Sequence, residues 1–308
     1  MKGELRIYLE TIRSRLRLDP SSEGEIVREF YTHLEDRASD LRREGLGEEE
    51  ATMAAARSFG SPQAIAREMY QTYSRGSWRQ AGLAALPHIL FAFLFTLHLW
   101  DNPVWLLVFS IATMATAVFG WRHGKPMWVF PWLGYSMLPL LVAGLFLLFL
   151  PPWTYLAILA YIPLFCLLVG AITVQAMRRD WLYASLMLLP LPIAGGWLIA
   201  FQFQGGLVDY VRQHINDMEP WIALSFFTLA LTAVTFVRLR RRRLKTGALL
   251  TPELIIMVLV AMTMKSVLGF LGLLLLAVFA LAILLSPALV EHRVGRGVIE
   301  DGSEADLS

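Results

Sequence analysis

Four ionisable residues stand within or at the ends of long apolar runs: His88, His98, Glu253 and Lys265. Such residues are costly in a membrane and often mark proton or ion pathways. The two histidines are ten residues apart, so on a helix they lie about 15 Å apart along the axis, too far to share one metal ion. Glu253 and Lys265 stand near opposite ends of one run, so we expect their side chains to reach the membrane surface.

No catalytic motif accompanies these residues. The sequence contains no HExxH, no GxSxG, no Walker-type loop and no paired-aspartate membrane motif. Its single cysteine, Cys166, lies in an apolar run, which excludes a disulfide framework and a cysteine-based metal site. We therefore expect a protein that is not an enzyme and holds no cofactor and no metal.

A second candidate is the stretch LPLPIAGG, which places Pro190, Pro192, Gly195 and Gly196 inside one apolar run. In transporters, broken helices present carbonyl groups and half-helix dipoles to a substrate. Prolines also kink helices that serve no transport role, because neighbouring helices tolerate the kink. The sequence leaves both interpretations open.

Basic residues gather beside the apolar runs. We expect them to contact lipid headgroups and to set the topology, and they are Arg178, Arg179, Arg238, Arg240, Arg241, Arg242, Arg243 and Lys245. Each cation near an anionic lipid surface contributes about 1 kcal/mol. This juxtamembrane position predicts contact with lipid rather than with nucleic acid.

The apolar runs predict an all-α membrane domain of eight spans. The chain is 56% hydrophobic and 17% charged, which is too apolar for a soluble domain. The runs cover 81–100, 103–121, 127–150, 153–176, 181–203, 220–239 and 249–290. The last run is about twice as long as a bilayer requires, so we divide it at Lys265-Ser266; one tilted or broken helix is the alternative. The loop 204–219 predicts a short interfacial helix, with a ligand-facing lid as its alternative.

Charge predicts the orientation. If the N-terminus is cytoplasmic, the connections rich in arginine all fall on the same side as that terminus, in agreement with the positive-inside rule. The first 20 residues are charged throughout, which argues against a secretory signal. We expect both termini in the cytoplasm, with 79–291 in the membrane and 292–308 as a flexible tail.

Residues 1–78 predict a small cytoplasmic domain of four helices. The first helix covers 3–18, and a capping box at Ser22 starts the second, which runs to Gly45. The third helix begins at the acidic residues 48–50 and ends at Gly60. The fourth begins at Ser61-Pro62, an N-cap followed by proline. Helices this short are unstable alone, so we expect them to share one core.

The motifs of this prefix carry a family resemblance. LRIYLETIRSRLRL, HLED, GLGEEEA and SFGSPQAIA resemble the HAAS domain, a helix-turn-helix-associated α-helical signalling module, and are similar to the prefix domain of some bacterial permeases. The resemblance covers about residues 4–74 of the chain. It implies a non-catalytic bacterial module, often encoded beside PadR-type repressors, that couples membrane proteins to regulators. No large periplasmic domain follows the prefix, which argues against an efflux permease.

Three functional hypotheses follow. The first is a regulatory or sensory protein of the bacterial inner membrane, which docks a protein partner through residues 1–78. The second is a transporter or permease subunit that uses the interrupted fifth span. The third is a structural subunit of a membrane complex. Membrane lipids are expected partners in each, and assembly with like or unlike chains stays open.

Overall fold

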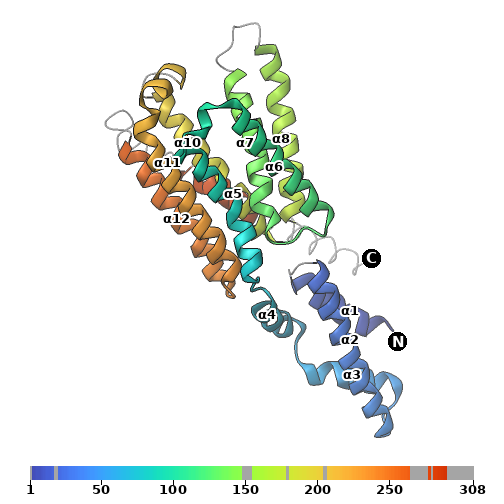
Figure 1. The fold of residues 1–308 in the computed structure, drawn as a ribbon. Coiled ribbons are helices and arrows are strands. Elements are labelled where there is room, and N and C mark those ends of the chain that lie inside the picture. The colour runs from blue at the N-terminus through green and yellow to red at the C-terminus, as the bar shows by residue number, and fades with distance from the viewer. Residues whose placement is uncertain are drawn as a thin grey trace. The chain divides into compact units, whose positions relative to one another are not determined.

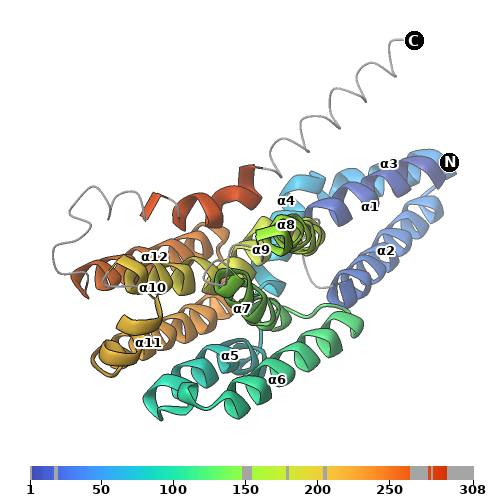
Figure 2. The ribbon, with the colours of Figure 1, turned by 90° about the horizontal axis from the view of Figure 1, so that it is seen from above.

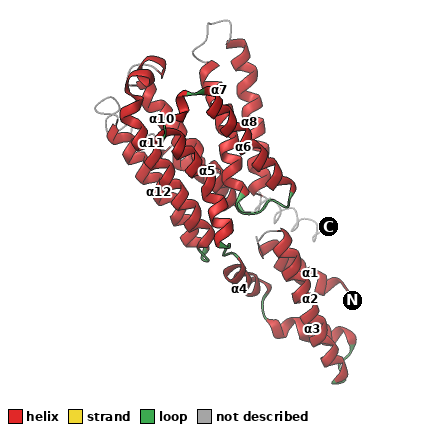
Figure 3. Ribbon diagram, in the orientation of Figure 1, coloured by secondary structure: helices red, strands yellow, loops and turns green. Residues whose placement is uncertain are grey.

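The fold is entirely helical in the part of the chain that the structure describes (Figures 1 and 3). The computed structural model describes residues 2–16, 20–147, 155–177, 180–203, 207–263, 277–278 and 280–289. These residues form the helices α1 to α12, one short 3-10 helix and a further helix at Ala280–Leu289, so the predicted all-α class is confirmed. The chain divides into an N-terminal unit, residues 1–76 with 239–241, and a bundle unit, residues 77–238 with 242–308.

The N-terminal unit holds four helices: α1 (Lys2–Leu16), α2 (Pro20–Arg43), α3 (Glu48–Phe59) and α4 (Pro62–Tyr73). Helix α1 packs against the other three, and α2 packs against α3. One core cluster contains Ile12, Leu16, Ile26, Phe30, Leu34 and Tyr70, and a second contains Ala38, Leu41, Ala51 and Ala55. The apolar side chains at three- and four-residue spacing on the first two helices are therefore the buried ones.

The ends of these helices follow the local sequence. Gly45 and Gly60 have positive φ values of 103° and 99°, which a residue without a Cβ adopts without strain. The Ser61 hydroxyl accepts a hydrogen bond of 3.2 Å from the Ala64 N–H, as predicted. One boundary is wrong: α2 begins at Pro20 rather than at Ser22, because proline fits the first turn of a helix.

The bundle unit begins with α5 (Trp78–Thr96), the 3-10 helix η1 (Leu99–Asp101), α6 (Pro103–Arg122) and α7 (Val129–Leu147). It continues with α8 (Tyr155–Met177), α9 (Trp181–Leu188), α10 (Pro190–Phe203), α11 (Leu207–Arg238) and α12 (Arg242–Thr263). Helix α7 is central (Figure 2): it packs against α5, α6, α8, α9 and α10, and residues 129–138 are all buried. Helix α11 packs along α5 and α12.

Four helical segments in the described residues are long and apolar enough to cross a membrane, and not the predicted eight. They are Pro103–Arg122, Leu159–Met177, Trp181–Leu198 and Asp217–Arg238. The first predicted span falls short because α5 carries Arg79 and Gln80 in its first turn and ends at Thr96. The third and seventh predicted spans each extend into residues that the structure does not describe. The proposed division at Lys265-Ser266 lies outside the described residues. Four such helices suggest a multi-pass membrane protein.

Helix α11 corrects the predicted interfacial helix at 204–219. Residues Leu207–Arg238 form one helix of 32 residues with Pro220 inside it, so the predicted separate helix continues into the apolar segment. Proline removes only one helical hydrogen bond, and packing against α5 and α12 compensates for that loss. A helix of this length extends about 48 Å, longer than a hydrocarbon core of about 30 Å.

Candidate functional site: buried polar groups of the bundle unit

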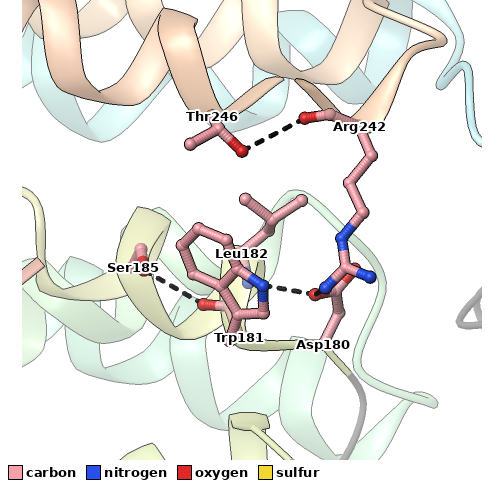
Figure 4. Close-up of polar contacts among 6 residues, drawn as sticks. All are labelled: Asp180, Trp181, Leu182, Ser185, Arg242 and Thr246. Atoms are coloured by element: carbon pink, nitrogen blue, oxygen red, sulfur yellow. Dashed lines mark hydrogen bonds and ion pairs between the residues drawn. The ribbon is translucent and has the colours of Figure 1, made fainter. Parts of the chain in front are cut away.

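An ion pair joins the beginnings of α9 and α12 (Figure 4). The Asp180 carboxylate is fully buried; it accepts hydrogen bonds from the Leu182 N–H at 3.2 Å and from Nη2 of Arg242 at 2.9 Å. The first of these contacts caps α9. The Arg242 guanidinium also lies 6.0 Å from the ring centroid of Trp181, within reach of a cation–π attraction. One carboxylate thus fixes two helix ends.

The basic residues predicted to contact lipid have different environments. Arg240, Arg241 and Arg243 are exposed, as headgroup contact requires. Arg238 stacks 4.1 Å over the ring of Trp78. Lys245 is fully buried, with its ammonium 5.1 Å from the ring centroid of Phe236.

Lys245 is therefore not available to a lipid headgroup, whereas Arg242 pairs with Asp180 and keeps 37% of its side chain exposed. The two other predicted headgroup ligands, Arg178 and Arg179, lie outside the described residues.

Glu253 does not reach the membrane surface as predicted. Its exposed fraction is 0%, and neither carboxyl oxygen has a hydrogen-bond partner among the described residues. It stands eleven residues after the start of α12, which is about 16 Å along the helix axis. The prediction failed because residue spacing places Glu253 near a helix end but does not show which helices cover that face. Lys265, its predicted counterpart, lies outside the described residues.

His88 is buried in α5 against an aromatic cluster. Its Nδ1 lies 2.9 Å from the hydroxyl of Tyr135, and the two rings meet edge to face with centroids 5.1 Å apart. The rings of Phe91, Phe109 and Phe226 surround Tyr135. This hydrogen bond joins α5 to the central helix α7.

The sequence predicts His98 inside the first span, 81–100, but the residue lies beyond the end of α5 at Thr96. Its backbone is left-handed, with φ 51°, and its Nδ1 lies 2.5 Å from a carboxyl oxygen of Glu219. The Trp100 indole N–H donates to the same carboxyl group. Because His88 and His98 have different polar partners, the structure does not bring them together. The described residues contain no cluster of three side chains that could hold a metal ion.

Sequence reasoning missed three of these groups: Asp180, Glu219 and Tyr135. A signal existed for the two acids, because each stands immediately before an apolar run, Asp180 before Trp181 and Glu219 before Pro220. An acid there caps or anchors the run. No pattern in the sequence indicates that Tyr135 faces His88.

The interrupted stretch of the fifth span is a tightly packed kink. Helix α9 ends at Leu188 and α10 begins at Pro190, yet Leu189 keeps helical angles of φ −50° and ψ −42°. Pro190, Pro192 and Gly196 are buried, and Gly195 is half-buried. A Cβ at Gly134 of α7 would overlap the Met187 carbonyl oxygen, so the two backbones touch there.

Comparison with known proteins identified no relative of this chain. The chain matches no protein-family model, no curated protein and no solved structure. The resemblance of residues 4–74 to the HAAS domain therefore stays a prediction, and the functional argument rests on the geometry above.

Proposed function

We propose that this chain is a regulatory or sensory protein of the bacterial inner membrane whose N-terminal unit docks a protein partner. Both termini are placed in the cytoplasm, and the apolar helices anchor the chain or receive a signal from the membrane. The HAAS-like motifs and the four membrane-length helices support this proposal. The partner expected from the resemblance is a PadR-type regulator.

The observation that carries the proposal is that the N-terminal unit includes a segment from between two bundle helices. Residues 239–241, which connect α11 to α12, belong to this unit, and the buried hydroxyl of Ser74 donates a 3.1 Å hydrogen bond to the Arg240 carbonyl. Partner binding that shifts α4 would therefore act on the segment that joins two bundle helices. Such a link gives a docking event a physical route to the membrane helices.

Two exposed tyrosines give the N-terminal unit side chains that are well suited to binding another protein. Tyr31 on α2 and Tyr73 on α4 are 45% and 48% exposed. Tyrosine is enriched among the residues that dominate protein–protein binding energy, because it buries a large area at little entropic cost.

Site-specific photo-crosslinking in intact cells tests the docking claim. A photoreactive phenylalanine analogue replaces Tyr31 or Tyr73 in the full chain, and Glu49 carries the same analogue in a control because it is also exposed. We expect one regulator, identified by mass spectrometry, to crosslink at the tyrosine positions and not at Glu49. The absence of a specific protein adduct at either tyrosine would reject docking.

The transporter hypothesis has less support from the geometry. The kink between α9 and α10 retains helical backbone angles, and its Met187 carbonyl packs against Gly134 rather than facing an open site. No contact among the described residues favours a purely structural subunit over a regulator.

A further inference from the structure

Glu253 differs in its surroundings from the other buried acids of the bundle unit. Asp180 is paired with Arg242, and Glu219 accepts from Trp100 and contacts His98. Glu253 is fully buried, and neither of its oxygens has a hydrogen-bond partner in the part of the chain that the structure describes. Burying an ionised carboxyl group without compensation is strongly unfavourable, so this group requires a positive charge.

Within the described ranges, the helices that pack most against α12 carry no positive charge paired with Glu253. Helices α9, α10 and α11 are those neighbours. Helix α10 has no ionisable residue, and α11 has none between Pro220 and Val237. The ionisable groups of the described neighbours are Tyr183 on α9, Asp180 before it, and Arg238 and the acids and bases before Pro220 on α11. Helix 280–289 is also free of ionisable residues.

Lys245 is a buried cation on α12 itself, but its ammonium contacts the Phe236 ring. It stands eight residues before Glu253, about 12 Å along the helix axis. Its ammonium lies over the Phe236 ring, and no ion pair joins it to Glu253, whose two oxygens are both unpartnered. Among the described residues, then, no positive charge pairs with Glu253, and a proton or cation from solution can supply one.

The residue before Glu253 is Pro252, which lies inside α12. Proline has no backbone N–H, so the carbonyl of Ala248 lacks its usual helical donor four residues later. No distance joins that carbonyl to the Glu253 carboxyl group, so the site rests on the carboxyl oxygens alone, which are among the ligands that hard cations prefer. We propose that Glu253 is a binding site for one positive charge, either a proton or a monovalent metal cation, inside the bundle unit.

This inference goes beyond the proposed function and does not depend on it, because the site lies wholly within the bundle unit. A charge bound at Glu253 would stabilise the packing of α12 on α9, α10 and α11. Release of that charge would leave an uncompensated carboxylate among apolar side chains, which disfavours the same packing. The site therefore couples the charge state of one residue to helix packing.

Labelling with dicyclohexylcarbodiimide tests the site in the full-length protein. This apolar reagent takes up the proton of a carboxylic acid, the carboxylate adds to its central carbon, and rearrangement gives a stable N-acylurea. We expect peptide mapping to find the adduct on Glu253 at neutral pH, and not on Asp180 or Glu219, because those carboxylates have partners. The Glu253→Gln variant should lose the adduct.

Two series of labelling experiments, one at varied pH and one in different salts, distinguish a bound proton from a bound metal cation. If a proton occupies the site, labelling falls as the buffer becomes alkaline and is the same in sodium, lithium and N-methylglucamine salts. If a metal cation occupies it, sodium or lithium protects Glu253 at constant pH and raises the apparent Tm of the wild type but not of Glu253→Gln.

One result would overturn the proposal: Glu253 labelled no more than Asp180 at acidic, neutral and alkaline pH, with an apparent Tm insensitive to both pH and salt. The wild-type labelling map needs no variant, so it decides the question even if Glu253→Gln fails to fold. A negative crosslinking result at Tyr31 and Tyr73 would leave this map unchanged, which separates the two proposals.

Discussion

The N-terminal unit and the bundle unit are both helical but manage their polar groups in opposite ways. In the N-terminal unit, ionised side chains face outward, as in the pairs Arg13–Glu23 and Arg42–Glu35. In the bundle unit, Asp180, Glu219 and Glu253 are buried. Water satisfies exposed charges at little cost, whereas a buried charge needs a specific partner.

The two units also differ in how their helices meet. The N-terminal unit packs leucine, isoleucine, phenylalanine and alanine side chains into small cores, and glycines at its turns provide positive φ. In the bundle unit, Gly120 and Gly134 let neighbouring helices approach until a Cβ would collide. Small-residue contact of this kind is typical of membrane helices, where apolar side chains gain little by leaving lipid.

The largest expected effect is at Gly134. Its replacement by alanine places a methyl group on the Met187 carbonyl oxygen and 2.9 Å from the Pro190 ring, neither of which can rotate away. We expect a loss of more than about 3 kcal/mol, above the usual cost of overpacking, measured as the temperature at which the detergent-solubilised protein aggregates.

The control for this substitution is Gly170→Ala, where no atom lies within 4 Å of the added Cβ. There, the better helix propensity of alanine should stabilise by up to about 1 kcal/mol. Equal aggregation temperatures for the two variants would contradict the close contact between α7 and the kink.

A core truncation in the N-terminal unit should cost almost as much. Leu34→Ala removes a buried side chain, and the cavity should destabilise this unit by about 3 kcal/mol. Limited proteolysis of the full chain should then cleave within residues 20–73 sooner than in wild type. His33→Ala, on the exposed side of the same helix, should not change the rate.

The ion pair of the bundle unit should have a smaller effect. Arg242→Ala leaves the Asp180 carboxylate buried without its cation, but Arg242 is 37% exposed. We expect a loss of about 2 kcal/mol, below the 3–5 kcal/mol of fully buried pairs. The neighbouring Arg243→Ala, at an exposed position, is the control for net charge. Similar melting temperatures for both variants would mean that the pair contributes nothing.

The smallest effect is expected at a helix cap. Ser61→Ala removes the acceptor for the Ala64 N–H and should cost about 1 kcal/mol. Hydrogen exchange should accelerate in the first turn of α4. Ser58→Ala, whose hydroxyl donates to a carbonyl within α3, should leave that turn unchanged. Faster exchange in both variants would show that the effect is not specific to the cap.

The sequence predicted the N-terminal helix ends closely because they depend on local chemistry. Gly45, Gly60, Ser61 and Pro62 each act on backbone groups within a few residues. Hydropathy was less successful in the bundle unit, where it predicted eight spans and a separate helix at 204–219. An apolar run shows where a helix can cross a membrane. The residues at which that helix begins and ends also depend on charged end turns and, in α11, on packing on both sides of Pro220.

Sequence alone determined the all-α class, the prefix helix ends at Gly45, Gly60 and Ser61, and the set of ionisable residues in apolar runs. The tertiary structure decided their surroundings. It paired Arg242 with Asp180, 62 residues away, and placed His88 against Tyr135. It buried Glu253 with no hydrogen-bond partner in the described ranges. Helix ends depend on hydrogen bonds within one turn, whereas partners and burial depend on which distant helices pack together.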